Sequence, residues 1–141
     1  MEDSKEFESQ VARIARNLWP SATNGGAVMI NNQERDGYYE TDENIHILAC
    51  TTSRRLEKAR IDCKKLNSVV SALQKRHPDK AVKGWFITKN EPTADQRTEA
   101  GKYAPNVYIT SFDRFQAKLI DVMDYFNSRE NHPFGSIRDP E

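Results

Sequence analysis

The chain has 141 residues, a length that suits one domain with its own core and excludes any need for disulfides or metals to hold it together. Hydrophobic residues make up 37% of the chain and charged residues 30%, which indicates a soluble globular protein. The 21 basic and 21 acidic side chains cancel, so net charge offers no argument for nucleic-acid binding. Any such argument must come from local charge.

Cysteine usage and hydropathy concern the location of the protein. Cys50 and Cys63 form no CxxC pair, which favours a reduced, cytoplasmic protein. The acidic and polar start of the chain is unlike a signal peptide. No apolar run reaches membrane-spanning length, so no membrane partner is expected.

Hydrophobic periodicity predicts alternating helices and strands. In chain order we expect a helix at 5–18, strands at 27–30 and 45–50, a helix at 53–76, a strand at 85–88, a short helix that stops at Gly101, a strand at 107–110 and a final helix after Ser111. Ser4 and Ser111 are expected to cap the first and last helices, and Thr93 with Gln96 forms a capping box. The long helix has an apolar stripe that should face the sheet: Leu56, Ala59, Cys63, Leu66, Val70 and Leu73.

The order of the elements predicts an α/β fold, a mixed sheet of four or five strands with helices on its faces. The strand at 45–50, the helix at 53–76 and the strand at 84–88 should form a right-handed parallel crossover. Residues 131–141 lack periodicity and are expected to link the domain, residues 1–130, to a missing C-terminal region.

The most informative segment runs from Glu34 to Arg55. An Arg-Asp-Gly junction at 35–37 precedes a buried strand, and the strand leads into a basic helix. Residues 54–65 carry six basic and two acidic side chains, a local charge of +4 that would attract a polyanion. Metal-dependent cleavage of a phosphodiester needs a carboxylate, a second acidic or carbonyl ligand and a cation, and this segment can bring such groups together.

These residues resemble the PD-(D/E)xK nuclease superfamily, which has the restriction-endonuclease-like fold. The resemblance is closest to N-terminal effector domains of bacterial NACHT or STAND-type antiviral ATPases and covers roughly residues 5–130. The matching pieces are the Phe7-Glu8 helix, Arg35-Asp36-Gly37, IHILACTTSRRLEKARIDCKKL and VYITSFDRF. The resemblance implies a restriction-endonuclease-like mixed β-sheet flanked by helices, double-stranded DNA as substrate and Mg²⁺ or Mn²⁺ as cofactor. It also implies fusion to an ATPase or sensor region and activity only on oligomerisation.

The resemblance also assigns the metal site and the remaining catalytic groups. Asp36 takes the place of the metal-binding aspartate, and Ala49 occupies the second acidic position. The backbone carbonyl of Cys50 takes the place of a further metal ligand, and Glu8 corresponds to the glutamate that many members carry in the first helix.

The basic residues after the strand complete the assignment. Position 51 is threonine where the family pattern expects lysine, so Lys58 is the first candidate for a catalytic lysine that has moved into the helix. Lys64 is the second candidate. The residues expected to contact DNA are Arg54, Arg55, Lys64 and Lys65.

Alanine at position 49 leaves two functions open. Either natural degeneration or an engineered change accounts for it, and the otherwise intact pattern favours the engineered change. The first function is a metal-dependent DNA endonuclease effector that Ala49 impairs. The second is a non-catalytic nucleic-acid-binding or adaptor domain with the same fold. A P-loop nucleotide-binding effector is disfavoured, because the chain has no GxxxxGK[ST] motif.

Several of these residues also have plainer interpretations. Asp36-Gly37 is a common turn dipeptide, and Lys58 on a helix is typically solvated. Glu8 is a possible surface residue beside an apolar stripe. His46, within an apolar strand, is expected to be buried and hydrogen-bonded, and Trp85 to belong to the core.

Overall fold

The computed structural model describes residues 2–22, 28–30, 33–35 and 37–120, and all structural statements concern these residues. The described part confirms an α/β fold in which four helices flank a mixed sheet. The elements are α1 (Glu2–Leu18), β1 (Val28–Ile30), β2 (Gln33–Arg35), β3 (Gly37–Glu40), β4 (Asn44–Thr51), α2 (Leu56–Arg76), β5 (Ala81–Thr88), α3 (Ala94–Gly101), β6 (Val107–Ser111) and a helix at 112–120. Asp36, the end of the last helix and the expected linker at 131–141 lie outside the described residues.

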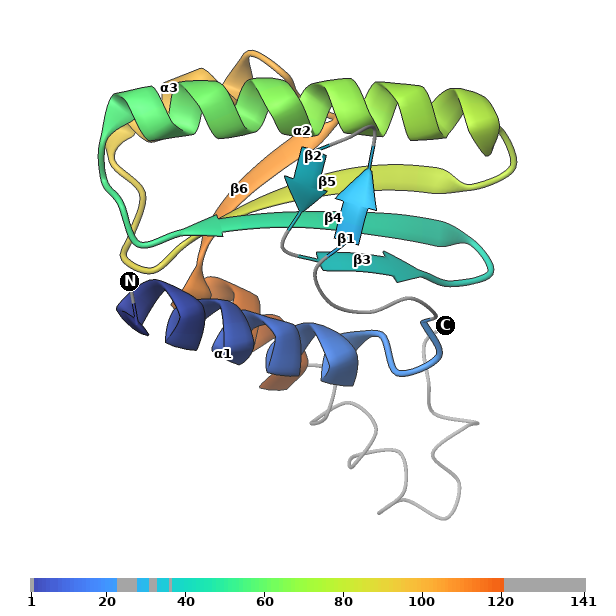
Figure 1. Cartoon of the computed structure of the whole chain (residues 1–141), viewed down its shortest axis with the longest axis horizontal. Coiled ribbons are helices and arrows are strands. Elements are labelled where there is room, and N and C mark those ends of the chain that lie inside the picture. The colour runs from blue at the N-terminus through green and yellow to red at the C-terminus, as the bar shows by residue number, and fades with distance from the viewer. Residues whose placement is uncertain (1, 23–27, 31–32, 36, 121–141) are drawn as a thin grey trace, which may run out of the picture.

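The main sheet has four strands in the order β3-β4-β5-β6, and β1 pairs separately with β2. Strand β3 runs antiparallel to β4, whereas β4, β5 and β6 are parallel. Helix α2 connects β4 to β5, so the expected parallel crossover is confirmed. Figure 1 shows α2 and α3 over one face of the sheet, and α1 with the helix at 112–120 over the other.

The face under α2 is closed by aliphatic packing. The expected stripe is buried from Ala59 to Leu73, and only Leu56 at the helix start is half-buried. Opposite it, β4 contributes Ile45 and Ile47, which are fully buried. Gly84 of β5 lets the helix approach, because a Cβ there would lie 3.1 Å from Cγ2 of Val70 and 3.2 Å from the Asn106 carbonyl oxygen.

The face under α1 is built largely from rings. The apolar face of α1 is buried at Phe7, Val11, Ile14 and Ala15, as the periodicity predicts. It packs with Leu48 of β4, the next residue on the strand after Ile47, because successive side chains on a strand point to opposite faces. Around them stand the aromatic rings Trp19, Tyr39, Trp85, Phe112 and Phe115.

Some element ends differ from the sequence prediction. Helix α1 already begins at Glu2, so Ser4 lies inside the helix instead of capping it. Helix α2 begins at Leu56 and not at 53, because the hydroxyl of Ser53 accepts a hydrogen bond from the backbone N–H of Arg55 (3.1 Å) in a turn that precedes the helix. The capping box of Thr93 and Gln96 is confirmed. Ser111 also caps as expected, accepting from the backbone N–H of Arg114 at 3.2 Å.

Membrane insertion finds no support in the described helices. None of them combines the length and the apolar composition that a transmembrane helix requires.

Candidate functional site

The two predicted acidic positions flank one cross-strand pair. Gly37, the first residue of β3, pairs with Leu48 of β4. Asp36 precedes Gly37 in the chain, and Ala49 follows Leu48, although Asp36 itself lies outside the described residues. Strand β2, which ends at Arg35, also contacts β4. The chain segments on both sides of position 36 thus lie next to β4.

Ala49 is half-buried on the face of the sheet that α2 covers. It is in register with Phe86 of β5 and packs against the cluster that contains Ala59 and Cys63 of α2. Its methyl group offers no oxygen to a metal. The neighbouring Cys50 is buried with its side chain on the opposite face, and it forms no disulfide with a described residue.

The described residues do not supply a metal site. Among them, no group of three or more His, Cys, Asp or Glu side chains is placed to hold an ion. Thr51, where the family pattern expects lysine, accepts a hydrogen bond at its Oγ1 from the backbone N–H of Ser53 (3.0 Å). The described residues alone therefore offer no set of side-chain ligands for Mg²⁺.

Glu8 and Ala49 belong to different faces of the sheet. Helix α1, which carries Glu8, packs on the face where Leu48 and Cys50 point. Glu8 itself is half-buried and has an interaction partner. The described geometry therefore does not bring Glu8 and Ala49 together, and a shared role for them stays a prediction.

The connection from β4 to α2 presents two arginines to solvent. Arg54 and Arg55 are exposed, and neither forms an ion pair with a described residue. Arg55 is the N-cap residue of α2 and makes no side-chain capping hydrogen bond. The Gln96 side-chain amide donates a hydrogen bond to the Ser53 carbonyl oxygen (3.2 Å). This bond holds the backbone of the connection directly before Arg54.

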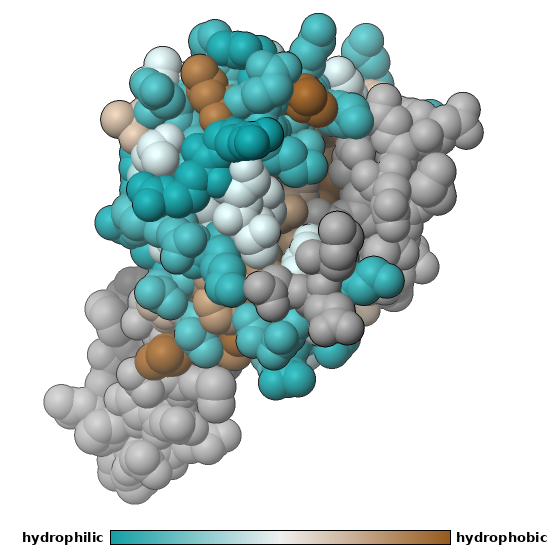
Figure 2. Space-filling view, turned by 60° about the vertical axis from the view of Figure 1, so that its left-hand side comes forward, coloured by the Kyte–Doolittle hydropathy of each residue, from teal (hydrophilic) through white to brown (hydrophobic). Residues whose placement is uncertain are grey.

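The lysines of α2 differ in whether a neighbouring side chain compensates their charge. Lys58 Nζ lies 3.2 Å from Asp62 Oδ2 along the helix surface, so its charge is compensated locally. Lys64 is exposed, and Lys65 is exposed but has an interaction partner. Of the two candidate catalytic lysines, Lys58 lies six residues closer along the chain to the end of β4. The side of the molecule where β4 ends and α2 begins is mostly hydrophilic (Figure 2).

His46 confirms the expectation of a buried, hydrogen-bonded side chain. Its Nδ1 accepts a hydrogen bond from the Trp85 Nε1–H group (3.0 Å), and its ring stacks on Trp19 with a centroid distance of 3.8 Å. Burial, together with the nearby Lys83 ammonium, lowers the pKa of His46 from 6.5 to about 4. The imidazole is therefore neutral and holds the indole of Trp85 in a fixed orientation.

A second site was missed by the sequence interpretation. Trp85, expected in the core, is half-buried and lines a pocket of about 610 Å³ together with Tyr108 and four basic side chains. These basic side chains come from β5, α3 and the last helix: Lys83, Arg97, Arg114 and Lys118. No spacing in the sequence relates them, because tertiary packing alone brings them together.

Comparison with known proteins defines the fold of this chain. No family model matches the chain, and no curated protein matches it. Among solved structures it is similar to the crystal structure of a protein of unknown function, AF1548, with a TM-score of 0.50 and 16% sequence identity. The match covers 74% of this chain and 58% of that one, so this chain spans little more than half of that protein. At this identity the similarity shows an α/β fold alone.

Proposed function

We propose that this chain is a DNA endonuclease domain of the PD-(D/E)xK kind in which Ala49 impairs cleavage but duplex-DNA binding is retained. The observation that carries the proposal is the pairing of Gly37 with Leu48. It joins the two chain segments from which the family takes its acidic ligands, and alanine stands at one of the two positions. Support also comes from the direct connection of β4 to the basic start of α2.

DNA binding is assigned to the start of α2. The positive end of the helix dipole and the exposed Arg54 and Arg55 side chains favour a phosphate at this position. Lys64 and Lys65 extend the positive charge along the helix. Phosphate contacts need no metal ligand, so binding survives the loss of the carboxylate at position 49. It should weaken as salt is added, because binding releases counterions from the DNA.

The binding step is tested with a fluorescently labelled DNA duplex titrated by anisotropy at several salt concentrations. Replacing Arg54 and Arg55 by glutamine should weaken binding roughly tenfold and reduce the slope of log K against log salt by about 2. The matched control replaces Arg13 and Arg16, two exposed arginines of α1, with the same loss of charge. Equal losses in both double variants would contradict the assigned surface.

The cleavage step is tested by restoring the missing carboxylate. Ala49→Glu should give Mg²⁺- or Mn²⁺-dependent nicking of plasmid DNA when the domain is clustered by fusion to an oligomerising coiled coil. Ala49→Gln has the same shape without the charge and should stay inactive. Asp36→Ala in the Ala49→Glu background should abolish the restored activity. Failure of the clustered Ala49→Glu protein to cut, while it folds and binds DNA, would reject the endonuclease.

The alternative function is a non-catalytic nucleic-acid-binding or adaptor domain. The engagement of Lys58 with Asp62 favours it, because a catalytic lysine should face the phosphate instead of a neighbouring carboxylate. So does the local hydrogen bond of the Thr51 hydroxyl. This alternative predicts DNA binding that depends on Arg54 and Arg55 but no cleavage in any Ala49 variant.

The proposal extends to the cellular setting. An effector nuclease must be controlled, so we expect fusion to an ATPase or sensor region whose assembly clusters the domains. Cutting both strands then takes two copies, since one active site cuts one strand. Access to DNA agrees with a cytoplasmic location, and so do Cys50 and Cys63, which form no disulfide in the described part of the chain.

A further inference from the structure

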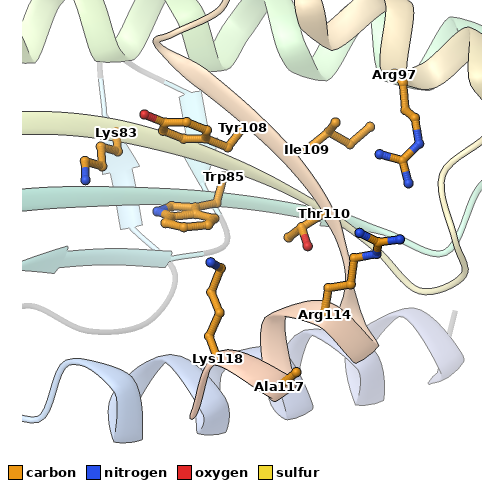
Figure 3. Close-up of a pocket in the computed structure, with 9 residues that line it drawn as sticks. All are labelled: Lys83, Trp85, Arg97, Tyr108, Ile109, Thr110, Arg114, Ala117 and Lys118. Atoms are coloured by element: carbon orange, nitrogen blue, oxygen red, sulfur yellow. The ribbon is translucent and has the colours of Figure 1, made fainter. Parts of the chain in front are cut away.

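A pocket of about 610 Å³ lies at the outer strand of the sheet, between β5, β6 and the helix at 112–120. Its size falls within the range of small-molecule sites. Figure 3 shows the two aromatic side chains on one side of it, with Lys118 directed at them from the last helix and two arginines at the other end. Among the described residues that line it, none is acidic.

The aromatic wall is large, rigid and partly open. The rings of Trp85 and Tyr108 lie 5.5 Å apart at 37°, and Tyr108 is 41% exposed. The hydrogen bond that Trp85 donates to His46 fixes the orientation of the indole, and Trp19 in turn stacks on the His46 ring. An aromatic surface held in this way can take a flat ring without reorganising, which reduces the cost of binding.

The charges around the wall favour an anion. Lys118 Nζ lies 5.7 Å from the centre of the Trp85 ring, and Lys83 lines the pocket from β5. Arg97 and Arg114 both contact one carboxylate, that of Glu91, with an Arg114 Nη2 to Glu91 Oε2 distance of 3.2 Å. Among the described residues, one carboxylate thus compensates only part of the charge of the four basic side chains that line the pocket.

We propose that this pocket binds one nucleotide unit, with the base on Tyr108 and Trp85 and the phosphate on Arg114 and Lys118. A free phosphate would use the charges but not the rings, and an uncharged aromatic molecule would use the rings but not the charges. Stacking on aromatic side chains with a phosphate held by arginine is the usual way in which proteins bind unpaired nucleotides. The nucleotide is either free or an unpaired unit of a DNA strand.

The pocket is independent of the proposed endonuclease centre. Trp85 and Tyr108 project from the face that α1 covers, whereas Ala49 faces α2. The two proposals therefore fail separately: a variant of the pocket leaves position 49 intact, and restored cleavage by Ala49→Glu says nothing about the pocket.

The test uses the two tryptophans of the chain as internal reporters. In a ¹⁵N–¹H correlation spectrum of the full chain each indole gives one side-chain peak. Titration with dAMP should move the Trp85 peak saturably and leave that of Trp19 nearly unchanged, whereas inorganic phosphate or deoxyadenosine alone should bind at least about tenfold more weakly. The proposal is overturned if the Trp85 peak does not move at millimolar dAMP, or if inorganic phosphate moves it at equally low concentrations.

Variants separate the base contact from the phosphate contact. Tyr108→Ala and Arg114→Gln should each weaken dAMP binding by roughly tenfold, the first through lost stacking and the second through a lost charged hydrogen bond. Lys75→Gln removes an exposed charge on α2, in the other helix layer, and should change nothing. Well-dispersed spectra identify the variants that fold, and unchanged affinity in folded Tyr108→Ala would overturn the proposal.

A hexamer of deoxyadenylate distinguishes the two sources of the nucleotide. Binding of the hexamer much tighter than that of dAMP, with the same dependence on Tyr108, identifies a DNA strand as the ligand. Equal affinities identify the free nucleotide. Either result supports the nucleotide pocket, whereas hexamer binding that does not involve Tyr108 contradicts it.

Discussion

The same strands present different kinds of side chain on the two faces of the sheet. The α2 face is a buried, mostly aliphatic core to which β4 contributes Ile45 and Ile47, and β5 contributes Phe86. The α1 face carries aromatic rings and the neutral His46, and an open pocket with basic side chains lies beside them at the outer strand, where α3 also contributes Arg97. Alternation along each strand sends neighbouring residues to opposite faces, so Trp85 and Phe86 belong to different environments.

The two faces therefore differ in how much they contribute to stability and to binding. Core residues of the α2 face, such as Ile45, Ile47 and Phe86, are fully buried, whereas Trp85 and Tyr108 line an open pocket at the outer strand. We therefore expect large stability losses from changes on the α2 face and small ones at the pocket. Substitutions at four sites test this expectation through the free energy of unfolding.

Phe86→Ala should lower the free energy of unfolding by about 4 kcal/mol, because it leaves a cavity in a core that cannot collapse around it. Phe86 is fully buried. On the other face, Tyr108→Ala should cost less than about 1 kcal/mol, since much of the ring is already in water. Urea denaturation of both variants measures the two values. Similar costs would show that the pocket wall is part of the core.

His46 should make the α1 face sensitive to acid. Its pKa is lowered to about 4 by burial and by Lys83, so the unfolded chain binds a proton that the folded one excludes. Stability contributed by the neutral imidazole is complete above pH 6.5 and is lost as the pH falls towards about 4, up to about 3 kcal/mol.

The measurement compares urea denaturation of the wild type and His46→Phe at pH values between about 7.5 and 4.5. The carboxylates titrate alike in both proteins, so the difference reports on His46. The wild type should lose more stability over this range, although the variant starts lower because the Trp85 indole N–H loses its acceptor. Parallel curves would show that His46 is charged or solvated in the folded state.

Gly84 tests how closely α2 packs on the sheet. Gly84→Ala should destabilise by roughly 1–2 kcal/mol, because the added Cβ meets Val70 and the backbone oxygen of Asn106, and backbone yields little. Gly101→Ala is the matched control, since a Cβ there has no atom within 4 Å. It lies in helix α3, where alanine is favoured, so it should be neutral or slightly stabilising. Equal effects would mean that the contact at Gly84 relaxes.

Much of the α2 face was predictable from the sequence. Residues 45–50 of β4 are a near-continuous apolar run, and α2 carries a regular stripe, so local pattern and final burial agree. The capping box at Thr93 was also legible, because its two hydrogen bonds join residues three apart. The start of β5 was missed, because Ala81, Lys83 and Gly84 lack the hydrophobic pattern of a strand and are held by pairing with β4.

The α1 face could not be predicted in the same way. The partners of His46 come from distant segments, with Trp19 after the first helix and Trp85 on β5. The pocket combines side chains whose only relation is the packing of four elements: β5, α3, β6 and the helix at 112–120. For the proposed endonuclease centre, the sequence named Asp36 and Ala49, and the structure adds the register of the strands next to them. A metal site at these positions stays a prediction.

The smallest loss of stability is expected at the end of β3, where Glu40 meets Lys80, the residue before β5, beside the start of β4. Lys80 Nζ lies 2.6 Å from Glu40 Oε2 and donates to the Thr41 carbonyl oxygen, and the Tyr38 hydroxyl donates to Glu40 Oε1 at 2.9 Å. The hydrogen bond from Lys80 is the main cause that lowers the pKa of Glu40 below its usual value. The stabilising effect of the ionised Glu40 is therefore present above the pKa of the carboxyl in the unfolded chain. It is lost as the pH falls through the pKa of the carboxyl in the folded protein.

Glu40→Gln should cost about 1 kcal/mol near neutral pH and less in acid, because the pair of Glu40 and Lys80 is mostly shielded from water. Glu57→Gln, which breaks an exposed pair with Arg60, should cost close to nothing. Urea denaturation of both variants at neutral and acidic pH decides the matter, and an equal, pH-independent cost would show that the Glu40 pair is no better sheltered than one on the open surface.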